Sequence, residues 1–308
     1  MATKQEISKE ILHIRNCAQD DVRRKYLKQL AEYTNRDVIL YCSAYTTPQA
    51  SGAPQDAISI ITGDIQGFMT ALHGMQNNRL DIIIHSPGGS VEAVDQIISY
   101  LRTKYDHIRA IVPQNAMSAA SMFACACDEI IMGKHSAIGP IDPQITFPLT
   151  NGQRFTAPAY SLIAEFKKAH DEIIANPQTA PLWIPKLTSW PAGILDICEK
   201  HITLAKDKVC TWLQSYMFAQ DEDKYNKAIK IAEWLGNDIN HLTHGHPISI
   251  KEAEEHGLRV IPLEDDQTLQ DLVLSVFHAS IVTMEMTSCV KIIENHRGVG
   301  VFAKVQKS

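Results

Sequence analysis

Short apolar runs alternate with amphipathic stretches through the first half of the chain. The runs at 37–45 (DVILYCSAY), 80–84 (LDIII) and 108–113 (IRAIVP) predict strands. Residues 91–101 lie between two of these runs and carry their apolar side chains at helical spacing. Continuous apolar strands that alternate with helices are typical of a mostly parallel sheet covered by helices. The pattern therefore predicts an α/β fold.

Helical spacing dominates both ends of the chain. Residues 4–33 and 266–296 each predict a helix, because apolar side chains recur every three or four positions between charged ones. We therefore expect an N-terminal helical segment over 1–36, a central α/β domain over 37–265 and a C-terminal helical extension over 266–308.

Composition narrows the possible functions. The chain has 308 residues, 45% of them hydrophobic, which is enough for a sizeable core. Its formal net charge of −6 offers no basic field for nucleic acid, so we expect no nucleic-acid partner. No window is long and apolar enough for a membrane span, and the N-terminus lacks a signal-peptide pattern. We expect a cytoplasmic protein with no integral membrane segment.

Cysteine and histidine spacing gives no sign of a metal centre or a disulfide framework. The seven cysteines include no CxxC pair, which is consistent with reduced, buried thiols. The turn THGHP (243–247) holds two histidines but brings no further ligands of its own. We therefore expect neither a metal nor a cofactor.

Two turns are the strongest candidates for chemistry. Ser86-Pro87-Gly88-Gly89 follows one apolar strand, and Ser118 follows the next, at the start of a small-residue helix. Ligands bind outside the carboxyl ends of parallel strands, so both turns should face one site. Glycine amides at such a turn can stabilise an oxyanion, and a serine at a helix start can act as a nucleophile. Ser121, one turn later, is expected to face the packed interior.

Three blocks together resemble a known family. They are IIIHSPGGSVEAVDQI, then VPQNAMSAASMFACACDEIIMGKHSAIGPIDPQI, then THGHPISIKEAEEHGL, in that order. They look like the serine dehydrogenase proteinase family, which is similar to the Clp protease proteolytic subunit and to signal peptide peptidase A. The resemblance implies a crotonase/Clp-protease-like β-α-β spiral over 37–265, with helices added at both termini. It also implies a serine peptidase with Ser118 as the nucleophile and the Gly88, Gly89 and Ala119 amides as the oxyanion hole.

The general base is where the sequence departs from the family pattern. The region in which Clp-type enzymes carry a histidine contains Asp142 instead, so the resemblance favours the lysine used by signal peptide peptidases. A lysine can act as a base when burial lowers its pKa. Lys208 lies on a largely apolar predicted helix and is our candidate. The alternatives are Lys167, Lys168, His135 and His244.

Three functions compete. The first is a serine peptidase of the Ser–Lys kind that cleaves peptides or unfolded protein. The second is a catalytically silent member of the fold that acts as a scaffold or binding subunit, which the missing base favours. The third, an acyl-CoA hydratase or isomerase, ranks last because no carboxylate pair accompanies the turns. The resemblance further implies a homo-oligomer, and because no P-loop is present, any unfolding motor would be a separate regulatory partner.

Overall fold

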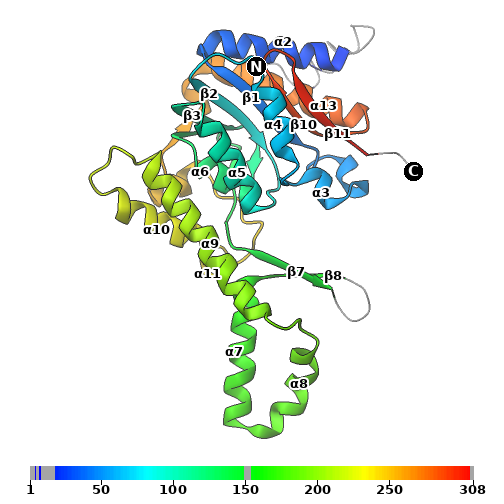
Figure 1. The fold of residues 1–308 in the computed structure, drawn as a ribbon, viewed down its shortest axis with the longest axis vertical. Helices are drawn as coiled ribbons and strands as arrows, with labels where there is room; N and C mark the ends of the chain where they lie inside the picture. The colour runs from blue at the N-terminus through cyan, green and yellow to red at the C-terminus, as the bar shows by residue number, and fades with distance from the viewer. Residues whose placement is uncertain (1–3, 5–6, 8–17, 149–153, 306–308) are drawn as a thin grey trace.

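A seven-stranded sheet forms the centre of the molecule in the computed structural model, which describes residues 4, 7, 18–148 and 154–305 (Figure 1). The strand order is β11-β10-β1-β2-β3-β5-β9, and the five strands from β1 to β9 run parallel. Strands β10 and β11 extend the sheet in antiparallel register beyond β1. The strands of this sheet are β1 (Asp37–Ser43), β2 (Arg79–His85), β3 (His107–Val112), β5 (Glu129–Met132), β9 (Val260–Pro262), β10 (Cys289–Asn295) and β11 (Gly300–Lys304).

Helices cover both faces of the sheet, because alternate strand residues point into two separate cores. Ile39 and Tyr41 pack with one set of helices, whereas Val38 and Leu40 pack with another. On the first face lie α4 (Asp64–Leu72), α5 (Val91–Arg102), α6 (Ala119–Cys125), α9 (Ile194–Ser215) and α10 (Lys224–Gly236). On the second lie α2 (Ala18–Thr34) and α13 (Gln267–Met286). The predicted α/β fold with a mostly parallel sheet is confirmed.

Smaller elements surround this core. Two short strands, β4 (Asn115–Ala116) and β6 (Ala137–Ile138), pair in parallel, and β7 (Gln144–Pro148) and β8 (Arg154–Pro158) form an antiparallel hairpin. The remaining helices are α3 (Gln55–Ile58), α7 (Ala159–Ala175), α8 (Ala180–Thr188), α11 (Asp238–His241) and α12 (Ile250–Glu255). Within the described ranges, three 3₁₀ turns lie at Pro48–Gly52, Pro177–Thr179 and Leu263–Asp265.

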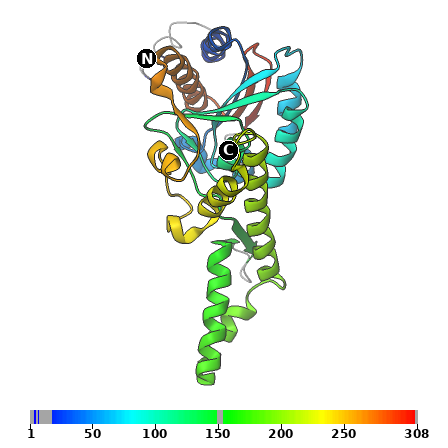
Figure 2. The same cartoon turned by 90° about the vertical axis from the view of Figure 1, so that its left-hand side faces the viewer.

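An arm projects from the sheet domain and consists of the β7–β8 hairpin, α7 and α8 (Figures 1 and 2). It has a small hydrophobic core of its own, which α9 joins through Ile194 and Cys198. Leu182 and Ile174 remain largely exposed on it. No helix in the ranges that the structure describes is sufficiently long and apolar to cross a bilayer.

The C-terminal helix is shorter than the sequence predicts. Helix α13 ends at Met286, and the following residues form β10 and β11, so the predicted helix over 266–296 is wrong beyond Met286. Charged residues in this stretch imitate the polar face of a helix, but Lys291 and Glu294 are buried. The Glu294 carboxylate forms an ion pair with Arg23 Nε at 2.7 Å, and Lys291 Nζ forms one with the Asp64 carboxylate at 3.0 Å. Because Arg23 and Asp64, both distant in sequence, neutralise these charges, Glu294 and Lys291 can be buried in a strand inside the sheet. The part of the predicted N-terminal helix over 8–17 lies outside the described residues.

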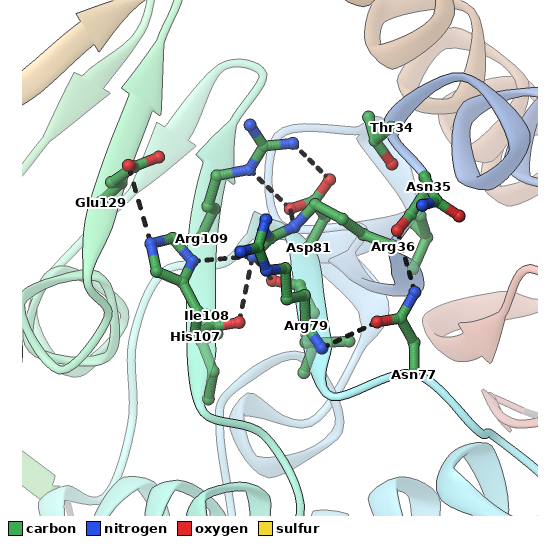
Figure 3. Close-up of polar contacts among 12 residues, drawn as sticks. Thr34, Asn35, Arg36, Asn77, Arg79, Asp81, His107, Ile108, Arg109 and Glu129 are labelled. Atoms are coloured by element: carbon green, nitrogen blue, oxygen red, sulfur yellow. Dashed lines mark hydrogen bonds and ion pairs between the residues drawn. The ribbon is translucent and has the colours of Figure 1, made fainter.

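A buried carboxylate joins the amino-terminal ends of β1, β2 and β3 (Figure 3). Asp81 is fully buried and accepts two hydrogen bonds from Arg109, both at 2.7 Å. Arg36 forms an ion pair with the same carboxylate at 2.6 Å and donates to the carbonyl oxygens of Leu80 and His107. This Asp81 cluster lies at the end of the sheet opposite the Ser86–Gly89 turn and the turn that carries Ser118. We therefore expect it to contribute to the stability of the sheet.

We predict that Asp81→Asn destabilises the protein by about 3 kcal/mol, because it leaves two largely buried guanidinium groups without their counter-charge. Urea denaturation monitored by circular dichroism measures the change in the free energy of unfolding. Glu32→Gln is the control, since its pair with Lys28 spans 3.8 Å between exposed side chains and should contribute below about 0.5 kcal/mol. Equal effects of the two substitutions would contradict the assignment of Asp81 as a stabilising centre.

Candidate active site

The two turns predicted to carry chemistry lie against each other. Ser86 donates its backbone N–H to Asn115 O at 3.1 Å, and Met117 donates to Ser86 O at 3.0 Å. These bonds continue the sheet beyond β2, as a parallel bridge between Ser86 and Ala116. The turn after β2 and the start of α6 are therefore held in one register.

Gly88 lies directly against Ser118. It has φ +103°, and a Cβ built on it would stand 2.6 Å from Met117 O and 2.8 Å from Ser118 Cβ. Any other residue at this position would collide with the backbone that carries Ser118 and would be strained as well. The contact between the two turns thus explains why the sequence has glycine at position 88.

Ser118 adopts a backbone conformation that is rare for a serine. Its φ of +52° and ψ of −121° place it outside the usual regions, at the position that precedes α6. Such strain in a non-glycine residue is characteristic of functional sites, and the strand–turn–helix setting resembles a nucleophile elbow. Its hydroxyl has no hydrogen-bond partner among the residues that the structure describes, and the side chain lines a cleft.

Ser121, in contrast, has a structural role. It is fully buried, donates to Ala116 O at 2.7 Å and accepts from Gly139 N at 2.8 Å. Both capacities of its hydroxyl are therefore used to join α6 to β4 and to the residue after β6. This agrees with the expectation that Ser121 faces the interior.

The three predicted oxyanion donors differ in their hydrogen bonding. The Gly88 amide donates to Ser86 Oγ at 3.2 Å. The amides of Gly89 and Ala119 have no acceptor within the described ranges, and Ala119 is the first residue of α6. Unpaired backbone N–H groups in the two turns that meet at a serine are the kind of donors that can stabilise a developing oxyanion.

A segment that sequence reasoning missed covers the glycine turn. Ile60 donates its N–H to Gly88 O at 2.7 Å and accepts from Ser90 N at 2.9 Å. A Cβ on Gly89 would stand 2.1 Å from Ile60 O, so the second glycine is required by this contact. Ile60 thus fixes the direction in which the Gly89 amide points.

Buried charges hold the segment around Ile60, which covers the glycine turn, in place. Lys291 Nζ donates to Ser59 O at 2.6 Å and contacts the Asp64 carboxylate at 3.0 Å. The same carboxylate accepts from Ile61 N at 3.1 Å and from the Tyr41 hydroxyl at 2.8 Å. Burial lowers the pKa of Lys291, which the Asp64 charge partly offsets. Strand β10 therefore supports the segment around Ile60 through the side chain of Lys291.

The cleft has a volume of about 840 Å³ and opens between the sheet domain and the β7–β8 hairpin. Ser118 and the glycine turn form one wall, and Gln144, Thr146 and Thr156 of the hairpin form another. Two histidines, His201 of α9 and His244 of the THGHP turn, also line it. His201 was not a candidate from the sequence, because it lies isolated on a polar stretch of a long helix.

His244 is paired with a buried carboxylate. Its Nδ1 lies 2.7 Å from Asp142 Oδ1, and Asp142 is 1% exposed. The other carboxylate oxygen accepts from Gln144 Nε2 at 2.8 Å. A carboxylate can only accept, so the hydrogen lies on Nδ1 and the lone pair lies on Nε2. This is the arrangement in which an acid orients a histidine to act as a base.

The other base candidates lie away from the cleft. Lys208 forms an ion pair with Asp95 at 2.7 Å and lines a different pocket. Lys167 and Lys168 are exposed on α7, in the arm. His135 lies 2.9 Å from Pro113 O through its Nε2. None of these four side chains lines the cleft that contains Ser118, so the geometry gives no support to a lysine base. Of the sequence candidates, it favours His244.

Neighbouring titratable groups serve the fold. Burial lowers the pKa of His85, the residue before Ser86, to about 3, so its imidazole stays neutral. Burial also raises the pKa of the Cys125 thiol on α6 to about 12, which leaves it unreactive at neutral pH. Five of the six described cysteines are buried and all six are free, and Cys17 lies outside the described residues.

Two proteins of one archaeal organism are similar to this chain in sequence. An uncharacterized protein of Methanocaldococcus jannaschii, MJ0137, is 30% identical over 254 residues, which cover 81% of this chain and 78% of that protein. A second uncharacterized protein of the same organism, MJ1495, is 31% identical over 183 residues, or 59% of this chain and 51% of its own length.

Two solved structures show weaker similarity. A mutant of the 1510-N membrane-bound stomatin-specific protease has a TM-score of 0.37 and 15% identity, over 66% of this chain and 75% of that one. A ClpP1 mutant from Listeria monocytogenes has a TM-score of 0.35 and 13% identity, over 78% of this chain and 99% of that one. A family model also matches most of the chain. The model described as ClpP-like SDH-type serine proteinase matches residues 22–272. Because that range is well over half of the chain, the protein belongs to the ClpP-like SDH-type serine proteinase family.

Proposed function

We propose that the chain is a serine peptidase in which Ser118 is the nucleophile. The observation that carries the proposal is the setting of Ser118 in the cleft. Its hydroxyl is unpaired among the described residues, its backbone is strained at φ +52°, and it lies against the glycine turn. Membership of a serine proteinase family supports the reaction class. The tightly bonded Ser121 is not available for the same role.

The proposed reaction begins with attack by Ser118 Oγ on the carbonyl carbon of a peptide bond. The negative charge that develops on the carbonyl oxygen is stabilised by the Gly89 and Ala119 amides, which are free to donate. The dipole at the start of α6 adds to this stabilisation. Gly88 provides the close approach of the turn, and its amide would have to leave Ser86 Oγ to serve as a third donor.

We propose that His244 is the general base, with Asp142 as its orienting acid, in place of Lys208. The proton of Ser118 Oγ passes to His244 Nε2 while the Oγ–C bond forms. It then passes to the leaving amine as the C–N bond breaks, which gives an acyl-enzyme. Water, deprotonated by the same histidine, releases the acyl group and restores the serine. The His244–Asp142 contact and the cleft that His244 shares with Ser118 support this assignment.

The size of the cleft supports an extended peptide as the substrate. A volume of about 840 Å³ accommodates a drug-sized ligand or a few residues of extended chain, whereas a folded domain could not enter. Peptides or unfolded segments of protein are therefore the proposed substrates. The expected homo-oligomer, the separate unfolding partner and the cytoplasmic location stay predictions.

We predict that Ser118→Ala abolishes both peptide hydrolysis and labelling by a fluorophosphonate probe, because the attacking oxygen is removed. Mass spectrometry of the labelled protein locates the modified residue. Ser121→Ala should still be labelled, although it leaves the Gly139 N–H buried without an acceptor and should cost about 1–3 kcal/mol of stability. The assay is therefore run well below the unfolding temperature of that variant.

The labelling result also separates the two leading functions. A silent scaffold would leave even the wild-type protein unlabelled. Labelling of the Ser118→Ala variant at unchanged yield would rule out Ser118 as the nucleophile.

We predict that His244→Ala and Asp142→Asn each lower kcat/KM by about 10²–10⁴-fold, as expected when general base catalysis is lost. Lys208→Ala is the matched test of the lysine base and should leave kcat/KM within about threefold of the wild-type value, since Lys208 pairs with Asp95. Steady-state kinetics with a fluorogenic peptide measures all three. Full activity of His244→Ala together with inactivity of Lys208→Ala would reverse the assignment.

A further inference from the structure

A cluster of three potential metal ligands lies beside the cleft, around the turn that carries His244. His241 ends α11, His246 is the second histidine of the THGHP turn, and Glu252 lies on α12. One ligand atom from each of the three lies within 4.8 Å of the others. The cluster thus supplies the additional ligands that the THGHP turn lacks in sequence.

His241 carries a buried nitrogen that has no partner. The side chain is 3% exposed, and its Nε2 lies 2.9 Å from Trp234 O. A carbonyl only accepts, so Nε2 carries the hydrogen and Nδ1 presents a lone pair. This Nδ1 has no hydrogen-bond donor among the residues that the structure describes. A buried polar atom without a partner is unfavourable and requires an explanation.

His246 and Glu252 complete a set of nitrogen and oxygen ligands. His246 Nε2 lies 3.0 Å and 3.2 Å from the two oxygens of Glu252. An ordinary histidine–carboxylate hydrogen bond accounts for this pair, but it leaves His241 Nδ1 unexplained. The rings of His241 and His246 have centroids 5.4 Å apart, so both can turn a nitrogen to one centre.

The framework around the cluster is firmly held. Trp234 stacks on His256, with ring centroids 3.9 Å apart, and also contacts the His241 ring. Beyond His246, the chain is pinned by two hydrogen bonds between Ile248 and Ile138, and Ser249 caps α12. The ligands are therefore presented by elements that are fixed independently of any ion.

We propose that His241, His246 and Glu252 bind a divalent transition metal ion of the zinc class. Two imidazole nitrogens and one carboxylate oxygen are a ligand set suited to Zn²⁺, with a further position left for water or another ligand. The ion gives the buried His241 Nδ1 its partner. It also closes the chain between His241 and His246 into a ring that contains His244 and so restricts the movement of that turn. The site itself does not depend on Ser118 being a nucleophile.

Isothermal titration of EDTA-treated, gel-filtered protein with ZnCl₂ tests the proposal. We expect one ion per chain for the wild type, and an affinity that is about tenfold or more weaker for Glu252→Gln, which loses the charged ligand but keeps a similar shape. Glu254→Gln is the matched control, because Glu254 lies exposed on the same helix outside the cluster. Its affinity should equal that of the wild type.

Co²⁺ substitution provides a second measurement that does not depend on catalysis. The wild type and Glu254→Gln should show the visible absorption of a low-symmetry Co²⁺ site, and His246→Gln should lose it. Circular dichroism checks that each variant is folded. Equal Zn²⁺ affinities for Glu252→Gln and Glu254→Gln, or no binding at one ion per chain, would overturn the proposal even if the protein proves to be an active peptidase.

Discussion

The contact between Gly88 and Ser118 is the constraint on which the rest of the site depends. A side chain at position 88 would occupy the space of the Ser118 backbone, so the two turns can approach only with glycine there. The approach brings the glycine turn, with its unpaired Gly89 amide, against the start of α6, where the Ala119 amide is also unpaired. It is possible because β2 and β3 are adjacent and parallel, which places their carboxyl ends at one edge of the sheet.

Several layers of the molecule hold this contact in place. Ile60 lies over the glycines, Lys291 and Asp64 hold the segment that contains Ile60, and β10 holds Lys291. Ile60 is held through backbone hydrogen bonds, whereas Lys291 and Asp64 are buried charges that depend on each other across a long stretch of the chain. A buried charge without its partner is strongly destabilising, and such layers tolerate few arrangements other than the native one. The strained backbone of Ser118 is sustained by this surrounding structure.

Local pattern was sufficient to predict the sheet, the two turns and the buried position of Ser121, whereas the choice of Ser118 as nucleophile rests on the family resemblance and stays a prediction. These features depend on residues close together in the sequence, and their signals are apolar runs, glycines and small side chains. The contact between His244 and Asp142 could not be predicted, because the two residues are 102 positions apart and each looks ordinary in its own segment. Strand β10 was read as helix for a related reason, since its charges are neutralised by Arg23 and Asp64 from the other end of the chain.

The position of Lys291 has a consequence for how the protein is made. Lys291 contacts Asp64, which the ribosome produces 227 residues earlier. Until β10 emerges, β1 is an open edge of the growing sheet and the segment over the glycine turn lacks its anchor. Ser118 and the glycine turn are therefore translated early but acquire their final support late. A nascent chain of this design carries the two turns without their final support through most of its synthesis, and the candidate site is complete only when β10 pairs with β1.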